Sequence, residues 1–206
     1  MGCFDLTRAS AALVSLPRRT RQLLVVVQDG PGVFKAKVTT WELAGGSWQA
    51  AFPPLAATIG RNGFVAAEEK TEGDGCTPIG VYSLGLAFGS EAAASTAMPY
   101  RQTTGADCWI DDPVSPQYNR WVEGIPAGVS YEPMLRPDGL YRYGLVIEYN
   151  TAPVVAGKGS AIFMHLWRGG EPTAGCVALA EEDLLRILSW LQPSKQPLII
   201  LGGEQI

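Results

Sequence analysis

The chain has 206 residues, of which 47% are hydrophobic and 17% are charged, and its formal net charge is −4. This length is sufficient for one domain with a substantial core, and the high apolar fraction excludes a disordered chain. No basic cluster is larger than Arg18, Arg19 and Arg21, so the sequence has no electrostatic footprint for binding nucleic acid.

The first twenty residues contain a short run of small and apolar residues between Ala9 and Val14. Basic residues follow this run, whereas a secretory signal places its charge first and its small-residue cleavage site last. We therefore predict no signal peptide and treat residues 1–20 as a flexible N-terminal segment. No stretch approaches about 18 uninterrupted apolar residues, so no membrane-spanning helix is expected.

Short strands dominate the expected structure of the first half of the chain. Continuous apolar runs indicate buried strands, and alternating runs indicate strands with one exposed face. The strand expected at residues 47–52 should end at Pro53 and Pro54, because proline cannot donate a ladder hydrogen bond. The expected strands are residues 22–28, 34–43, 47–52, 63–67 and 80–86. Residues 89–98, rich in Ala and Ser, predict a short helix or a loop.

The second half predicts strands at residues 140–149, 160–167 and 197–201, with one clear helix before the last of them. Acidic residues from Glu181 to Asp183 suit the first turn of this helix, and Pro193 ends it. With 24 glycines and 15 prolines, the chain favours many strands joined by turns. We therefore predict a mostly β fold, either a mixed β-sandwich or a partly open barrel with a few short helices.

The only histidine, His165, precedes Cys176 by eleven positions and is separated from it by a Gly- and Pro-containing loop. A strand and a turn of this kind would bring an imidazole to a thiol, which is the pairing that a cysteine nucleophile needs. The glycine before the sulfur allows a tight turn, and amides around Cys176 could then face an oxyanion. The alternative is structural, because lone histidines and buried cysteines are usually part of a core.

Zinc binding is the other chemistry that thiols and an imidazole could support. The candidate ligands would be Cys3, Cys76, Cys108, Cys176 and His165. They include no Cys-x-x-Cys pair and no second histidine, so we expect no metal site.

Three blocks of the sequence, in this order and spacing, resemble the YkuD-type L,D-transpeptidase family in its branch with a Pro-Thr-x-Gly-Cys loop. The blocks are residues 70–82, which contain Glu-Gly-Asp-Gly and Thr-Pro-Ile-Gly, residues 109–119, and residues 149–179. The resemblance is strongest over residues 60–201. It implies that residues 1–206 form a single catalytic domain of L,D-transpeptidase-like fold.

The chain departs from the wider family in two places. Most members read Ser/Thr-His-Gly-Cys at the nucleophile, but here an alanine, Ala174, replaces the histidine. The family also carries Arg or Asn two places after the cysteine, where this chain has Ala178. The charge that binds a substrate carboxylate would then come from another residue. The candidates are Arg120, Arg142, Lys158 and Arg168.

The resemblance implies a cysteine-dependent acyl transfer on peptidoglycan peptide stems. Cys176 would be the nucleophile, His165 the base and the Gly175 amide part of the oxyanion site, with a backbone carbonyl near Leu166 orienting the imidazole. A thioester acyl-enzyme would form cross-links between L-centre diamino acid residues. No cofactor or nucleic acid is implied, and we expect a monomer that acts in the periplasm or cell envelope. An L,D-carboxypeptidase or amidase and a non-catalytic envelope-binding domain remain alternatives.

The resemblance also suggests which residues contact the substrate. These are Tyr118, Asn119, Trp109, Tyr149, Trp167 and Thr173. Cys76 and Cys108 fall in two blocks that we expect to face one another, and an oxidising compartment would allow a disulfide between them. The sequence does not decide that pairing.

Overall fold

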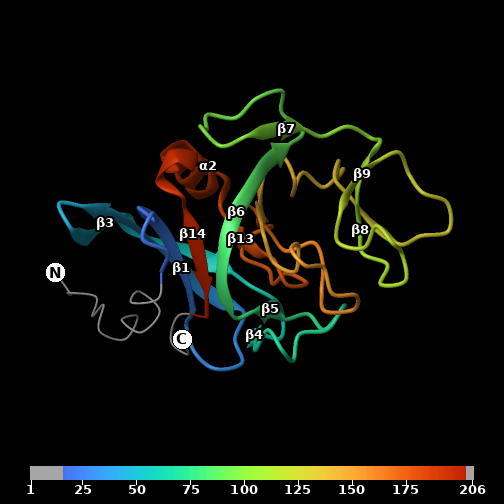
Figure 1. The fold of residues 1–206 in the computed structure, drawn as a ribbon, viewed down its shortest axis with the longest axis horizontal. Coiled ribbons are helices and arrows are strands. Elements are labelled where there is room, and N and C mark those ends of the chain that lie inside the picture. Colours follow the sequence, from blue (N-terminus) through green and yellow to red (C-terminus); the bar gives the residue numbers. More distant parts are fainter. Residues whose placement is uncertain (1–15, 203–206) are drawn as a thin grey trace.

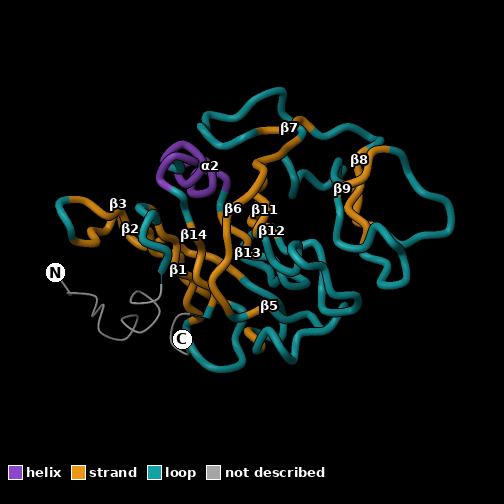
Figure 2. Tube along the Cα trace, viewed as in Figure 1, coloured by secondary structure: helices purple, strands orange, loops and turns teal. Residues whose placement is uncertain are grey.

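The computed structural model describes residues 16–202, so most of the predicted flexible segment at residues 1–20 lies outside the described residues. These residues are mostly β, as predicted, and they contain one α-helix, α2 (Glu181–Trp190), and a 3-10 turn at Pro193–Lys195 (Figures 1 and 2). The strands are β1 (Gln22–Gln28), β2 (Lys35–Ala44), β3 (Ser47–Thr58), β4 (Phe64–Val65), β5 (Thr77–Pro78), β6 (Gly80–Gly89), β7 (Tyr100–Gln102), β8 (Asp107–Ile110), β9 (Trp121–Glu123), β10 (Tyr131–Pro133), β11 (Gly144–Ile147), β12 (Phe163–Leu166), β13 (Val177–Leu179) and β14 (Leu198–Leu201).

The main sheet closes on itself into a barrel. Its strand order is β11-β12-β13-β3-β2-β1-β14-β6-β7, and β6 also pairs with β11, which completes the ring and leaves β7 attached outside it. Of the two architectures predicted, the barrel is therefore the one adopted. Two pairings are parallel within the ring, β1 with β14 and β12 with β13. The parallel β12–β13 pair is the one that positions the candidate site.

The interior of the barrel holds the largest apolar cluster, and alternation along each strand decides which residues enter it. On β12 and β13 these are Met164, Leu166, Val177 and Leu179. Helix α2 adds Leu184, Ile187 and Leu188 to the same cluster, and its acidic first turn agrees with the prediction from the sequence. The alternate residues of β12 and β13 therefore face outward.

A second apolar cluster covers this outer face. It joins Phe88, Val146 and Phe163 of the barrel to Trp109 and Met134 of the segment that contains the small antiparallel sheet β10-β8-β9. Figure 1 shows β8 and β9 set to one side of the barrel, and Figure 2 shows that loops connect most of this half of the molecule. The candidate site lies between the barrel wall and this outer layer.

Two predictions about local structure were wrong. Strand β3 does not end at Pro53 but continues to Thr58, because Val38 pairs with Leu55 while Thr40 pairs with Phe52. Both prolines therefore fall in a bulge, where no ladder N–H is required. The predicted strand limits at 140–149 and 160–167 were also too wide, since β11 and β12 each keep four paired residues.

Residues 90–99 contain no helix and form the loop that leads to β7, which is the second of the two predicted alternatives. The short strands β5, β7, β8, β9, β10 and β13 were not predicted. None is longer than four residues, so none shows enough periodicity to be recognised.

Candidate active site

Strands β12 and β13 bring the predicted nucleophile and base to one face of the sheet. His165 pairs with Ala178 and Met164 with Val177 in parallel register, and Cys176 directly precedes β13. Because side chains alternate between faces, His165, Ala178 and Cys176 all point outward from the barrel. The imidazole and thiol are thus diagonal neighbours, with the small side chain of Ala178 opposite His165.

The thiol of Cys176 is held by backbone groups of the preceding segment. Its Sγ donates to the carbonyl oxygen of Ala161 at 3.2 Å and accepts the N–H of Phe163 at 3.3 Å. Only 8% of the residue is exposed. Burial raises the pKa of Cys176 to about 12, with the Phe163 N–H acting in the opposite direction. The resting group is therefore a neutral thiol whose proton is directed at Ala161.

The imidazole of His165 is equally buried and has a defined orientation. Its Nδ1 lies 2.7 Å from the carbonyl oxygen of Leu166, the contact expected from the sequence, so Nδ1 carries the proton and Nε2 is an acceptor. The ring packs edge-on against Tyr141 at 5.2 Å. Burial lowers the pKa of His165 to about 4, so the ring is neutral at neutral pH.

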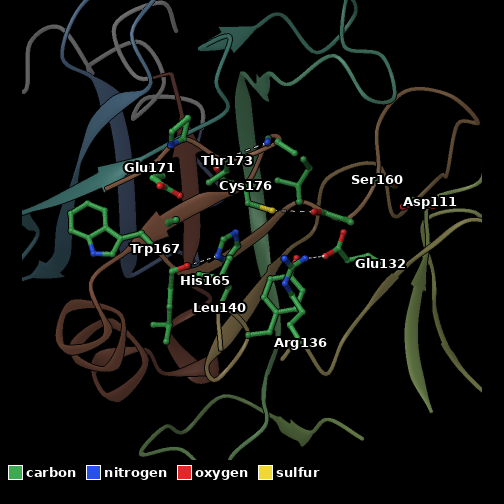
Figure 3. Close-up of a pocket in the computed structure, with 18 of the residues that line it drawn as sticks. Asp111, Glu132, Arg136, Leu140, Ser160, His165, Trp167, Glu171, Thr173 and Cys176 are labelled. Carbon is green, nitrogen blue, oxygen red and sulfur yellow. Dashed lines mark hydrogen bonds and ion pairs between the residues drawn. The ribbon is translucent and has the colours of Figure 1, made fainter. Parts of the chain in front are cut away.

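Both groups line one cavity of about 360 Å³ (Figure 3). The side chains of His165, Cys176 and Arg136 converge on it from different elements. Further lining residues are Lys70, Glu72, Asp111, Glu132, Asp138, Leu140, Tyr141, Ser160, Trp167, Arg168, Glu171, Thr173 and Gly175. The site therefore combines a thiol and a neutral imidazole with an unusual density of charged side chains.

The loop before the nucleophile is fixed by its own side chains. Thr173 Oγ1 donates to the carbonyl oxygen of Cys176 at 2.7 Å and accepts the N–H of Gly175 at 3.1 Å. A Cβ at Gly175 would come within 2.9 Å of the Cys76 carbonyl oxygen, and its φ of +153° also favours glycine. Because the Gly175 amide already has a partner, its role at an oxyanion stays a prediction.

The six residues expected to contact substrate fall into two groups. Trp167 and Thr173 line the cavity. The other four, Tyr118, Asn119, Trp109 and Tyr149, are at most 6% exposed and lie outside the cavity lining.

The hydrogen bonds of Asn119 explain why its side chain does not line the cavity, and contact of these four residues with substrate stays a prediction. Its Oδ1 accepts the N–H groups of Trp109 and Ala161, and its Nδ2 donates to the carbonyl oxygens of Tyr149 and Asn150. All four positions for hydrogen bonds are thus occupied by the protein. Asn119 fixes the Ala161 backbone, which in turn holds the thiol of Cys176.

Four basic residues were proposed from the sequence to replace the arginine that the family carries after the nucleophile, and most of them lie outside the cavity. Arg168 lines the cavity, with 60% of its side chain exposed, whereas Arg120, Arg142 and Lys158 do not line it. Arg136, which sequence reasoning missed, lies deeper and is held by Glu132 and Asp138. The segment around Arg136, Arg-Pro-Asp-Gly, predicts only a turn, so no local signal could have identified Arg136 as a residue of the cavity.

Cys76 and Cys108 are free thiols in this structure, so the disulfide left open by the sequence is not present. Each donates to backbone carbonyl groups of its own neighbourhood, Cys76 to Asn62 and Asp74, and Cys108 to Val122 and Gly124. Within residues 16–202, no cluster of three His, Cys, Asp or Glu side chains could hold a metal ion. Over the same range, no helix is long and apolar enough to span a membrane.

The buried imidazole should make folding stability depend on pH. The pKa of His165 is about 4 in the folded protein against an ordinary 6.5, so between these values the unfolded chain takes up the proton first. Stability is therefore lost as the pH falls through this window, by about 3 kcal/mol. Urea unfolding at pH 7 and pH 4 should show this loss in the wild type and a smaller one in His165→Gln. Equal losses in both proteins would contradict the assigned burial.

Comparisons with known proteins identify the family of this chain. The model of the YkuD family, the L,D-transpeptidase catalytic domain, matches residues 10–200. A search of curated proteins finds no match. Among solved structures, the chain is similar to Bd1075 of Bdellovibrio bacteriovorus, with 14% identity, a TM-score of 0.45, and coverage of 88% of this chain and 47% of that one.

It is also similar to the helical cell shape determining protein Pgp2 from Campylobacter jejuni, with 16% identity and a TM-score of 0.45. That likeness covers 90% of this chain and 51% of the Pgp2 chain. The chain thus spans about half the length of the solved structures that it matches.

Proposed function

The chain belongs to the YkuD family of L,D-transpeptidase catalytic domains, and on this basis we propose that it is a cysteine-dependent L,D-transpeptidase acting on peptidoglycan peptide stems. The observation that supports this most directly is that His165, on β12, and Cys176, directly before the parallel strand β13, line the same cavity. The proposal needs no cofactor, because a thiol and an imidazole suffice for acyl transfer. Action in the periplasm or cell envelope is part of the same proposal.

In the first half-reaction, His165 Nε2 takes the proton from Cys176, and Sγ attacks the carbonyl carbon of the L,D bond beside a terminal D-alanine. The tetrahedral intermediate then collapses, the C–N bond breaks, and the imidazolium returns its proton to the leaving amine. The products are a thioester on Cys176 and free D-alanine. In the next half-reaction the amine of a second stem attacks this thioester and gives a proton to His165, the C–S bond breaks, and Cys176 regains its proton as the cross-link forms.

The resting contacts indicate how the nucleophile becomes active. The thiol donates to Ala161, so its S–H bond must first turn from that carbonyl group toward His165. Burial disfavours both the thiolate and the imidazolium. We therefore expect proton transfer to accompany attack on a bound carbonyl group, so the enzyme does not hold a standing ion pair.

Hydrolysis of the same thioester is the second candidate function, and burial favours it. Cys176 and His165 are only 8% and 7% exposed, so water reaches the acyl group more easily than the amine of a second stem does. The enzyme would then be an L,D-carboxypeptidase. The two candidates share every step up to the thioester and differ only in the acceptor.

Incubation with purified tetrapeptide stems, followed by separation of the products by mass, tests the proposal. Dimeric product is the expected result for a transpeptidase, and tripeptide with free D-alanine is the expected result for the hydrolase. Cys176→Ala prepared in parallel controls for contaminating peptidases. Unchanged stems with an intact Cys176 thiol would contradict both candidates.

A further inference from the structure

Arg136 is the cation most firmly fixed near the candidate nucleophile. Its Nε and Nη2 donate to the two carboxylate oxygens of Asp138 at 3.1 and 2.6 Å, and its Nη1 donates to Glu132 at 2.5 Å. The guanidinium also lies over the ring of Tyr141, 5.2 Å from its centre. Tyr141 in turn packs against His165, so the ring of Tyr141 lies between Arg136 and the candidate base.

These contacts leave part of the guanidinium free. An arginine has five N–H donors, and Arg136 uses three of them on Glu132 and Asp138. The residue lines the cavity, and its side chain is only 29% exposed. A planar group clamped in this way loses little conformational freedom when it binds a further acceptor. It is therefore preorganised to donate to a ligand inside the cavity.

The other basic residues of the cavity are less suited to this task. Lys70 donates to Asp74 and to the carbonyl oxygen of Thr71, and its side chain is only 3% exposed. Arg168 lies at the rim with 60% of its side chain exposed. Ala178, which pairs with His165, brings no charge to the sheet face itself. Arg136 is thus the cation both fixed and available beside the thiol (Figure 3).

We propose that Arg136 is a specificity-determining residue that binds a substrate carboxylate next to the bond attacked by Cys176. Two N–H groups of one guanidinium match the two oxygens of a carboxylate. If the proposed function holds, this ligand is the terminal carboxylate of the departing D-alanine. Glu132 and Asp138 are then positioning residues that aim the guanidinium.

A pair of alkylating reagents that differ in one charge tests this without any peptide substrate. Rates of Cys176 labelling by iodoacetate and by iodoacetamide are measured by peptide mass, and their ratio is divided by the same ratio for glutathione. In the wild type we expect this normalised preference for iodoacetate to be about tenfold, in line with a charge-assisted hydrogen bond. In Arg136→Gln it should fall to about one.

Arg142→Gln is the matched control, because it removes the same charge from a residue that pairs with Glu91 outside the cavity. Its preference should equal that of the wild type. A wild-type preference of one or less would overturn the proposal, even if no variant folds. The same holds if Arg136→Gln keeps the full preference, or if neither reagent labels Cys176, since the cavity would then admit no carboxylate.

The outcome is separable from that of the proposed function. Stems ending in D-alanine and in D-alanine amide are compared with the wild type and Arg136→Gln. If the function holds and the Arg136 assignment fails, the variant changes kcat/KM equally for both stems. If the function fails and the assignment holds, neither stem reacts, while labelling of Cys176 still prefers iodoacetate.

Discussion

Cys176→Ala will abolish product formation from tetrapeptide stems, with a fall in rate of at least about 10³-fold, because no other thiol of residues 16–202 lines the cavity to form the thioester. His165→Gln will slow the reaction by about 10² to 10⁴-fold, since it removes the proton acceptor and leaves the nucleophile in place. Initial rates, followed by mass analysis of the products, measure both effects. Mass analysis of the intact wild-type protein should also detect the acylated form.

Cys76→Ala is the control for the loss of a thiol. Cys76 lies in the loop after Asp74, and its side chain donates only to backbone carbonyl groups of that region. The rate at which Cys76→Ala turns over tetrapeptide stems should stay within about twofold of the wild-type rate. A Cys176→Ala protein that is folded and still turns over stems would refute the proposed mechanism, and a normal rate in His165→Gln would remove the imidazole from it.

Asp74→Asn should destabilise the protein by about 3 to 5 kcal/mol, because it leaves the buried ammonium of Lys70 without its counter-charge. Lys70 Nζ lies 2.7 Å from Asp74 Oδ1. The side chain of Lys70 is only 3% exposed, and that of Asp74 is 17% exposed. The carboxylate also accepts the N–H groups of Thr71 and Cys76, so it fixes the whole turn. This turn carries Glu72 and Gly73 into the cavity wall.

Urea unfolding at neutral pH measures the change in free energy, and Asp29→Asn provides a matched control. Asp29 pairs with Lys37 at 3.0 Å, but these side chains are 42% and 56% exposed. An exposed pair contributes at most about 1 kcal/mol, so this variant should unfold nearly as the wild type does. Equal losses in the two variants would mean that burial of Lys70 does not determine the cost.

Local sequence signals identified the elements whose evidence lies within one segment. Strand β1 has the predicted limits, residues 22–28, because a continuous apolar run is buried on both faces. Helix α2 begins where the acidic residues at 181–183 place it and ends before Pro193. His165 and Cys176, which the sequence separates by a short loop, line the same cavity, and their joint role in catalysis stays a prediction.

Residues with a role set by distant partners could not be assigned in this way. Tyr118 and Asn119 have the side chains of groove residues, yet Tyr118 donates to Glu72, and Asn119 is surrounded by backbone groups and Trp109. A polar or aromatic side chain looks the same in a sequence whether it contacts a ligand or supports the wall behind it. Only burial and hydrogen-bond partners separate the two roles.

The amino-acid sequence by itself determined the mostly β fold, the helix before the last strand and the two residues proposed for acyl transfer. The fold and the helix follow from periodicity, the acidic first turn and Pro193, which act over a few neighbouring residues. The two residues follow from their spacing together with the resemblance to the YkuD family. The tertiary structure alone decided that Arg136, Glu132 and Asp138 stand beside the thiol. It also decided that burial holds Cys176 and His165 neutral. The physical reason is that cavity walls and desolvation arise from packing between segments far apart in the chain, here the barrel face and the layer around β8 to β10.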